Sequence, residues 1–296
     1  MKKILLATTA LVATAGMAAA EVKLSGLGRF GVLYIENAVP ETRLESRFRL
    51  TIDGSTEADG GIKFGARLRI QSDDAGTDSS VGLVNSPRFT VSSGGLTLGV
   101  GNILGAIDTN GEVYAGGQFG LSGLNWANVV SNFGSDTYSS AGRGRNGVEV
   151  IYSVGDFTAH LSNSTKGLDR TEIVLAYKLQ GFTIAAGYND SSRANDVEWT
   201  LGGSGSFGNV GVAAAVAEDQ EGQLSAALAA SYKIGAATKV GAFVALDDNF
   251  KGRAGRDEVA YGLEVEHSLG GGATLVGGFS TDHGINRADL GVTFNF

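Results

Sequence analysis

Positively charged side chains recur at alternate positions in two neighbouring stretches of the sequence. Residues two apart in an extended chain point to the same side, so each stretch would carry a row of basic groups. Such a row could be a solvated exterior face, or it could line a water-filled lumen and form half of an electrostatic filter. The members are Arg43, Arg47 and Arg49, then Lys63, Arg67 and Arg69, with Arg29 and Arg88 in the flanking stretches.

A tight-turn sequence, Asp59-Gly60, separates the two basic rows. Folding the chain about this turn would bring Arg49 close to opposite Arg69. Like charges directly opposed in a sheet are unfavourable, so this arrangement needs counter-charges or a function that uses it.

The counter-charges are expected in the segment between Asn102 and Gly147, which shows no clear alternation. At about forty residues it is too long for an ordinary connection and is typical of a functional loop. It carries Asp108, Glu112 and Asp136. If the loop folds inward, these carboxylates would face the basic rows across a narrowed passage. The alternative is a disordered exterior loop.

Motifs for catalysis are weak. Residues 142–147 match the spacing G-x-G-x-x-G, but they follow a loop and precede a predicted strand, whereas dinucleotide binding requires a strand before and a helix after. The histidines are scattered and lack metal-ligand spacing or a nucleophile arrangement. They are His160, His267 and His283.

Three acids in another loop, Asp73, Asp74 and Asp78, could hold a structural calcium ion. A solvated acidic loop is the favoured interpretation. We therefore expect no cofactor.

Strictly alternating segments recur from Val22 to the last residue, which indicates strands with one wet and one dry face. Counting them gives about sixteen, an even number as in single-chain bacterial barrels. The last segment shows the pattern most clearly. Its apolar face would carry Ala288, Leu290, Val292, Phe294 and Phe296.

Short glycine-containing turns alternate with longer polar loops along the chain, as in barrels that have short turns at one rim and long loops at the other. The polar face carries more charge than a closed core could bury. We therefore predict an all-β fold, an antiparallel transmembrane barrel whose long loop lies in the lumen. Four aromatic residues should lie near the short-turn rim: Phe157, Phe182, Phe207 and Phe296.

The N-terminus predicts export. Lys2 and Lys3 precede an apolar run that is too short for a membrane span and ends in small residues. The pattern predicts a signal peptide, residues 1–20, cleaved between Ala20 and Glu21, and one barrel domain, residues 21–296. Loss of two lysines changes the net charge from −8 to −10, which argues against nucleic acid as a partner.

Composition agrees with a barrel built without covalent cross-links. The chain has 46 glycines, two prolines and no cysteine. Such a balance is expected where tight turns join hydrogen-bonded strands, and 43% hydrophobic residues exclude a disordered chain.

The stretches 45–50 and 54–69 resemble the trimeric general-diffusion porins of purple photosynthetic and related Gram-negative bacteria. Residues 28–31, the pair Gly101-Asn102 and the aromatic end at Phe294 and Phe296 are also similar. The resemblance implies sixteen strands, a homotrimer and a third loop that constricts each pore. It also implies that the outer-membrane insertion machinery reads the aromatic end.

Carried over by position, the resemblance makes Arg47, Arg49, Arg67 and Arg69 wall residues of the constriction and Asp108 a loop acid. Leu104 departs from the family, which has an early acid there. The predicted function is passive diffusion of small hydrophilic solutes and ions across the lipid outer membrane, without catalysis. The alternatives are a plugged barrel that acts as an adhesin or structural protein, and a barrel hydrolase.

Overall fold

The computed structural model describes residues 20–74, 80–124, 128–140, 144, 146–165, 169–192 and 197–296. Within them the chain forms seventeen strand segments and two single-turn 3-10 helices. None of the helices in this part of the chain is long and apolar enough to cross a membrane.

The strands, in chain order, are β1 (Glu21–Ile35), β2 (Thr42–Ala58), β3 (Ile62–Asp74), β4 (Ser80–Val84), β5 (Arg88–Ser93), β6 (Leu96–Asn102), β7 (Asn146–Val154), β8 (Phe157–Ser164), β9 (Arg170–Leu179), β10 (Phe182–Ser191), β11 (Glu198–Phe207), β12 (Val210–Glu218), β13 (Leu224–Ile234), β14 (Thr238–Asp247), β15 (Val259–Gly270), β16 (Ala273–Asp282) and β17 (Ile285–Asn295). The helices are η1 (Gly111–Val113) and η2 (Asp248–Phe250).

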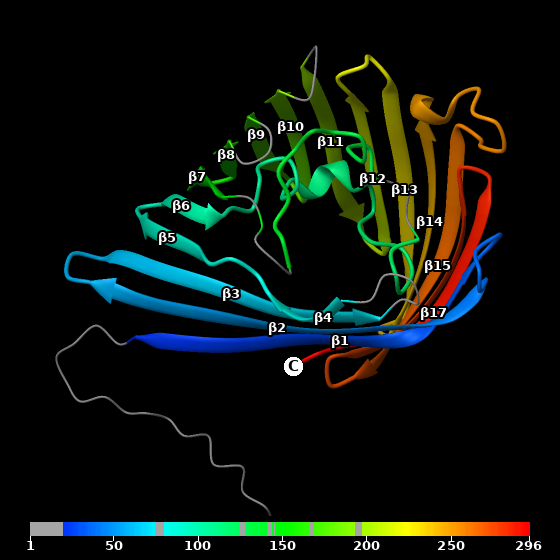
Figure 1. The fold of residues 1–296 in the computed structure, drawn as a ribbon, viewed down its shortest axis with the longest axis horizontal. Helices are drawn as coiled ribbons and strands as arrows, with labels where there is room; N and C mark the ends of the chain where they lie inside the picture. The colour runs from blue at the N-terminus through cyan, green and yellow to red at the C-terminus, as the bar shows by residue number, and fades with distance from the viewer. Residues whose placement is uncertain are drawn as a thin grey trace, which may run out of the picture.

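The strands close into one antiparallel barrel (Figure 1). The seam joins β1 to β17, from Leu27 opposite Asn295 to Ile35 opposite Arg287. Both β4 and β5 pair with β3, so they are two parts of one wall strand interrupted at residues 85–87. The seventeen described segments therefore make sixteen wall strands, which confirms the predicted fold class. Closure joins the first strand to the last, although among the described residues β4 pairs with β3 alone.

The two faces of the wall have the polarity of a membrane barrel. Outward side chains are apolar and exposed, for example Leu263 at 63% and Leu290 at 59% of their surface. Their inward neighbours Glu264 and Asp289 are 3% and 6% exposed. This arrangement is the inverse of a soluble barrel and gives an apolar band that suits lipid.

The antiparallel order places the short turns that follow β2, β5, β7, β9, β11, β13 and β15, together with Glu21 and the C-terminus, at one rim, while the two-residue turn at 283–284 lies at the other. The turn between β2 and β3 uses Gly60 and Gly61 with φ of 87° and 79°, a region that favours glycine. The four predicted rim aromatics lie at this end of their strands, and the rings of Phe182 and Phe207 are 4.7 Å apart.

The long segment between β6 and β7 lies inside the ring of strands, as predicted (Figure 1, green). Its apolar side chains pack against small residues on the inner wall, and this contact is the hydrophobic core of the protein. The approach is close at β11, where a Cβ on Gly202 would lie 2.4 Å from the Glu112 carbonyl oxygen. The core includes Ile107, Val113, Phe119, Val129, Val130 and Phe133 of the loop, and Ala185, Ala213, Ala215, Ala217, Ala227, Ala229, Ala245 and Ala260 of the wall.

Candidate functional site

Six arginines form a continuous belt on the inner face of four adjacent wall strands. Arg29 on β1 lies directly opposite Arg47 on β2, and Arg67 on β3 lies directly opposite Arg88 on β5. The other two continue the rows at the next inward positions of β2 and β3. In order around the wall, the arginine belt is Arg29, Arg47, Arg49, Arg69, Arg67 and Arg88.

The register between β2 and β3 differs from the prediction. The turn holds three residues, 59–61, so that Ala58 lies opposite Ile62. Arg49 therefore lies opposite Gln71, and Arg69 lies opposite Thr51. The Nε of Arg49 donates a 2.5 Å hydrogen bond to Gln71 Oε1. The diagonal offset avoids direct opposition of Arg49 and Arg69.

Four belt arginines are ion-paired with carboxylates of the wall itself. In two of the pairs the Nε atom lies 2.6 Å from Asp53 Oδ1 or 2.5 Å from Glu149 Oε1. Sequence reasoning missed Glu45, Asp53 and Glu149, although Glu45 and Asp53 have the same parity as the arginines of β2 and would share their face. It placed Asp73 in a loop, whereas Asp73 lies in β3. The pairs are Arg29 with Glu45, Arg47 with Asp73, Arg67 with Asp53 and Arg88 with Glu149.

The remaining predicted wall residues have no ion pair within the described part of the chain. Arg49 bonds the neutral Gln71. Arg69 Nη1 donates to Ser140 Oγ at 2.8 Å, and its guanidinium lies 4.7 Å from the centre of the Tyr138 ring. Two others lie near the ends of their strands, Arg43 toward the loop rim and Lys63 beside the turn at 59–61.

The long loop is held to the inner wall by carboxylates that accept hydrogen bonds from its backbone. Glu264 Oε2 accepts from the Gly120 N–H at 3.0 Å. Hydrogen bonds to a charged acceptor are stronger than neutral ones, so these contacts fix the path of the loop. The others are Glu149 with the N–H of Leu104, Glu172 with those of Ile107 and Asp136, Glu198 with that of Gly134, and Asp289 with that of Ser122.

These wall carboxylates were also missed. Each is an acid at an inward position of an otherwise alternating strand, which was the available signal; on β15, Glu266 shares the face of Glu264. Nothing local in the sequence indicates that their partners lie in a distant loop. Gly120 and Glu264, for example, are 144 residues apart.

The three predicted loop acids occupy different environments. Asp136 is fully buried and pairs with Arg170 on β9, with 3.3 Å between Oδ1 and Nη1, so the expectation that it faces the basic rows is wrong. A buried carboxylate is held where a cation neutralises it, and Arg170 lies behind the loop. The backbone carbonyl group of Glu112 lies against Gly202 on β11, and its carboxylate oxygen Oε2 is buried without a hydrogen-bond partner among the described residues.

Asp108 is joined within the loop to Tyr138, whose ring contacts the belt. It accepts hydrogen bonds from the Tyr114 hydroxyl at 3.0 Å and from the Tyr138 N–H at 3.3 Å. Tyr138 in turn contacts Arg69. Burial raises the pKa of the Asp108 carboxyl, and these two hydrogen bonds offset the shift only in part.

In the part of the loop that the structure describes, hydrogen bonds join it to the belt at two places. Its tip accepts a 3.2 Å hydrogen bond from Arg29 Nη1 at the Leu121 carbonyl oxygen, and its returning arm contacts Arg69 through Ser140. Arg47 and Arg49 lie between these contacts along the belt. The guanidinium groups of Arg47 and Arg49 therefore line the part of the inner wall between the two contacts.

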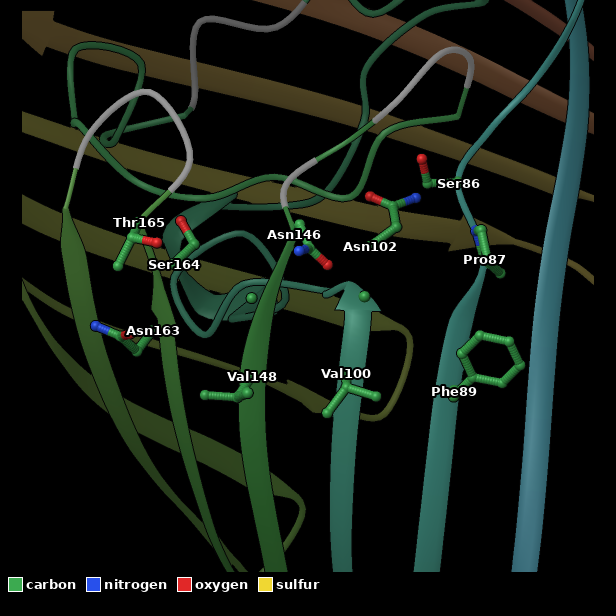
Figure 2. Close-up of a pocket in the computed structure, with 12 residues that line it drawn as sticks. Ser86, Pro87, Phe89, Val100, Asn102, Asn146, Val148, Asn163, Ser164 and Thr165 are labelled. Atoms are coloured by element: carbon green, nitrogen blue, oxygen red, sulfur yellow. The ribbon is translucent and has the colours of Figure 1, made fainter.

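The interruption of the fourth wall strand contains a residue that binds the returning arm of the long loop. Asn85 Nδ2 donates to the Tyr138 hydroxyl at 2.8 Å and to the Ser139 carbonyl oxygen at 2.7 Å. On the outer side of the same region lies a hollow of about 810 Å³. Figure 2 shows apolar Phe89, Val100 and Val148 on neighbouring strands, with polar Ser86 and Thr165 above them. These exposed apolar side chains place the hollow on the outer surface, outside the passage.

No group of three or more His, Asp or Glu side chains in the described residues could hold a metal ion. Asp73 pairs with Arg47, while Asp78, the third acid of the calcium hypothesis, lies outside the described residues. His160 Nε2 lies 3.1 Å from Glu149 Oε2, and the His283 ring stacks on Phe250.

A closed sixteen-stranded barrel with an apolar outer band, a charged interior and an inserted loop defines an outer-membrane channel. The family model for Gram-negative porins matches residues 7–286. A porin of Fuscovulum blasticum is 30% identical over 307 aligned residues, which cover 93% of this chain and 100% of that protein. A porin of Rhodobacter capsulatus is 28% identical over 319, with the same shares covered.

Solved structures agree. A variant of the Rhodopseudomonas blastica porin superposes with a TM-score of 0.81 at 28% identity, covering 93% of this chain and all of that one. Another variant of the same porin gives 0.80 at the same identity and coverage. The chain belongs to the Gram-negative porin family and forms an outer-membrane channel.

Proposed function

We propose that small hydrophilic solutes and ions diffuse passively through the opening between the arginine belt and the long loop, and that this opening is the constriction of the channel. The observation that carries the proposal is the position of the loop. Wall carboxylates hold it against β7, β9, β11, β15 and β17, and the described residues of the loop are hydrogen-bonded to the belt at Arg29 and Arg69.

The loop then sets the size limit and the belt sets the ionic bias. Confined water between low-dielectric walls screens charge poorly, so the guanidinium groups act strongly on passing ions. Planar-bilayer recording on the refolded mature protein tests the channel directly. Discrete conductance steps are expected, and swelling of liposomes in sugars of increasing size gives the limit. Absence of steps at all voltages would favour the alternative of a plugged barrel.

We propose that the mature chain begins at Glu21, after removal of residues 1–20. The support is that β1 begins at Glu21 and pairs with β2 from that residue, with Glu21 opposite Ser55. N-terminal sequencing of protein recovered from outer membranes should give Glu21. An intact N-terminus at Met1 would contradict the cleavage.

We propose a homotrimer that is assembled by the barrel-insertion machinery, on the basis of the sequence resemblance. The C-terminal aromatic residues lie at the short-turn rim, where the Phe296 ring stacks on that of Phe48 with 5.8 Å between centres. Light scattering of the detergent-solubilised protein, with the detergent contribution subtracted, should give three times the chain mass. A single-chain mass would count against the trimer.

The proposed activity is transport without catalysis. Its rival, a barrel hydrolase, requires a nucleophile, a histidine and an orienting residue close together. His160 contacts Glu149 and Thr109, and His267 contacts Thr238. Assay of the purified protein for lipid and peptide hydrolysis separates the two, since a channel alone should release no product.

A further inference from the structure

We infer that the lumen contains a binding site for a small neutral polyhydroxylated solute, such as a single sugar ring. The site is the hollow between residues 111–119 of the long loop and the inner face of β11, β12 and β13, which we call the niche. The inference rests on the proposed function, because the niche lies inside the channel. It names one class of solute that the channel would retain on its way through.

The niche is separate from the arginine belt. Its strands lie across the barrel from β2 and β3 (Figure 1). It is on the side of the long loop that faces the short-turn rim, where β11 and β13 end. Its volume of about 350 Å³ falls within the range of about 300–1,000 Å³ that is usual for small-molecule sites. A solute that has passed the loop therefore meets a hollow of suitable size.

The floor of the niche is a row of inward positions across neighbouring strands. Ser206 on β11 lies opposite Gly211 on β12, which in turn lies opposite Ser231 on β13. The row continues through Gly241 on β14 to Glu264 on β15. A Cβ on Gly211 would lie 2.6 Å from Ser231 Oγ, so a side chain at this position would crowd the hydroxyl and fill the hollow.

Three serine hydroxyls of the niche suit a polyhydroxylated ligand. Ser204, at the next inward position of β11, joins Ser206 and Ser231. Ser204 and Ser231 are half-buried, Ser206 is exposed, and none of the three hydroxyls has a hydrogen-bond partner among the described residues. A serine hydroxyl can donate one hydrogen bond and accept others, so it can bond a sugar hydroxyl in either role.

The charges beside the niche balance one another. Lys239 Nζ lies 3.4 Å from Glu264 Oε1 and 3.0 Å from Glu266 Oε1, and Lys233 lies opposite Lys239. Two lysines and two glutamates carry no net charge, so this group gives no preference for an ion. Glu264 lines the hollow, and a carboxylate has enough acceptor positions to bond a solute hydroxyl in addition to its present partners.

The roof of the niche is a tight turn of the long loop. The Gly117 N–H donates to the Tyr114 carbonyl oxygen at 2.7 Å, and a Cβ on Gly116 would lie 2.6 Å from that of Ala229, so the turn rests on the wall. The Tyr114 hydroxyl donates to Asp108 at 3.0 Å, which holds in place a ring that lines the hollow. An aromatic side chain offers apolar surface to the C–H groups of a sugar ring.

The test is the single-channel current of the refolded mature protein in a bilayer as glucose is added, with triethylene glycol at matched bulk conductivity as the reference solute. A solute held in the niche obstructs ion flow, so glucose should lower the current in a saturable manner. Triethylene glycol, which has few hydroxyls, should not. S206A/S231A should raise the half-saturating glucose concentration at least about threefold, because hydrogen bonds to the sugar are lost.

The matched control is S55A/S92A. Ser55 on β2 and Ser92 on β5 line a hollow of the inner wall beside the belt, outside the niche. This variant should respond to glucose as the unmodified channel does. A half-saturating concentration that is unchanged in S206A/S231A, or that rises equally in S55A/S92A, overturns the inference.

Saturation-transfer NMR of glucose with the folded barrel in detergent gives a readout that does not need conductance. Transfer should be seen with the unmodified protein and should weaken in S206A/S231A. A barrel that conducts but shows neither transfer nor a saturable loss of current overturns the niche and leaves the channel function standing. Transfer to a barrel that never conducts overturns the proposed function and leaves the niche. Displacement of glucose by lower concentrations of glycine or acetate overturns the neutral class of the ligand.

Discussion

Ser122 at the tip of the long loop is joined to Asp289 on β17 by two hydrogen bonds, from its backbone N–H and its hydroxyl, each 2.7 Å long and each to the same oxygen Oδ2. The contact ties a loop that leaves the wall at Asn102 to the strand that closes the barrel. It fixes the far end of the opening beside Arg29, whose Nη1 bonds the adjacent Leu121 carbonyl oxygen.

Loss of this contact should widen the channel. Each hydrogen bond to a charged group contributes about 1.5–3 kcal/mol, so D289A should release the loop tip. We expect faster liposome swelling with larger sugars and noisier single-channel currents. S122A keeps the backbone N–H donor and should have a smaller effect. Equal sugar flux in D289A and the unmodified protein would show that the tip does not limit the passage.

The alanine wall should control the opening from the other side. Ala229 is buried against the loop, and a larger side chain there costs about 1–3 kcal/mol unless the loop shifts toward the belt. A229L is therefore expected to lower single-channel conductance. The control is L228A on the same strand, since Leu228 is 55% exposed and outward-facing. If both variants conduct alike, the loop does not rest on this wall as described.

Selectivity should depend on pH through Asp108. Burial raises the pKa of this carboxyl above its ordinary 3.8, so it takes up a proton before most exposed aspartates as the pH falls. The folded state binds this proton more readily than the unfolded chain, and stability from this group is lost as the pH rises through the folded pKa.

Acidification should thus neutralise this loop carboxylate, which is joined to Arg69 through Tyr138, and raise the chloride-to-potassium permeability ratio. The measurement is the reversal potential between pH 7 and pH 4, which is roughly the ordinary range of carboxyl titration. D108N should start at the higher ratio and lose this pH-dependent step. A D108N profile that runs parallel to that of the unmodified channel would assign the titration to another group.

Assembly should depend on Gly26, which lies beneath the ring of the last residue, Phe296. A Cβ at Gly26 would lie 2.2 Å from the Phe296 ring, so G26A must displace an aromatic side chain at the seam between β1 and β17. We expect less folded barrel in outer membranes, measured as the heat-modifiable band on gels. G54A is a matched control, since the nearest atom there is 3.9 Å away. A normal yield of folded G26A would show that assembly does not depend on the packing of Phe296 against Gly26.

The wall could be predicted from the sequence because strand alternation has a period of two. Arg47 faces inward and Phe48 outward once the segment is recognised as a strand, and neither depends on distant residues. Register is harder. One additional turn residue, Gly61, decides that Arg49 meets Gln71, and it decides which carboxylates pair with which arginines.

The course of the loop could not be predicted for a different reason. It depends on contacts between residues far apart in the sequence, such as Gly120 with Glu264 and Ser122 with Asp289. It also depends on a dry contact with wall alanines, and nothing in the sequence around each alanine shows that its small size is needed for this contact. Asp136 illustrates the consequence, because only its three-dimensional partner Arg170 places it behind the loop.

The central claim is that water and ions pass between the belt and the loop, and the absence of cysteine from the chain permits a direct measurement. R49C would place a unique thiol in the opening, and F48C would place one on the outer face of the same strand, where Phe48 is 49% exposed. A bulky water-soluble thiol reagent added to the bath should reduce single-channel conductance stepwise in R49C and leave F48C unchanged. Unaltered current in a fully labelled R49C channel would contradict the account.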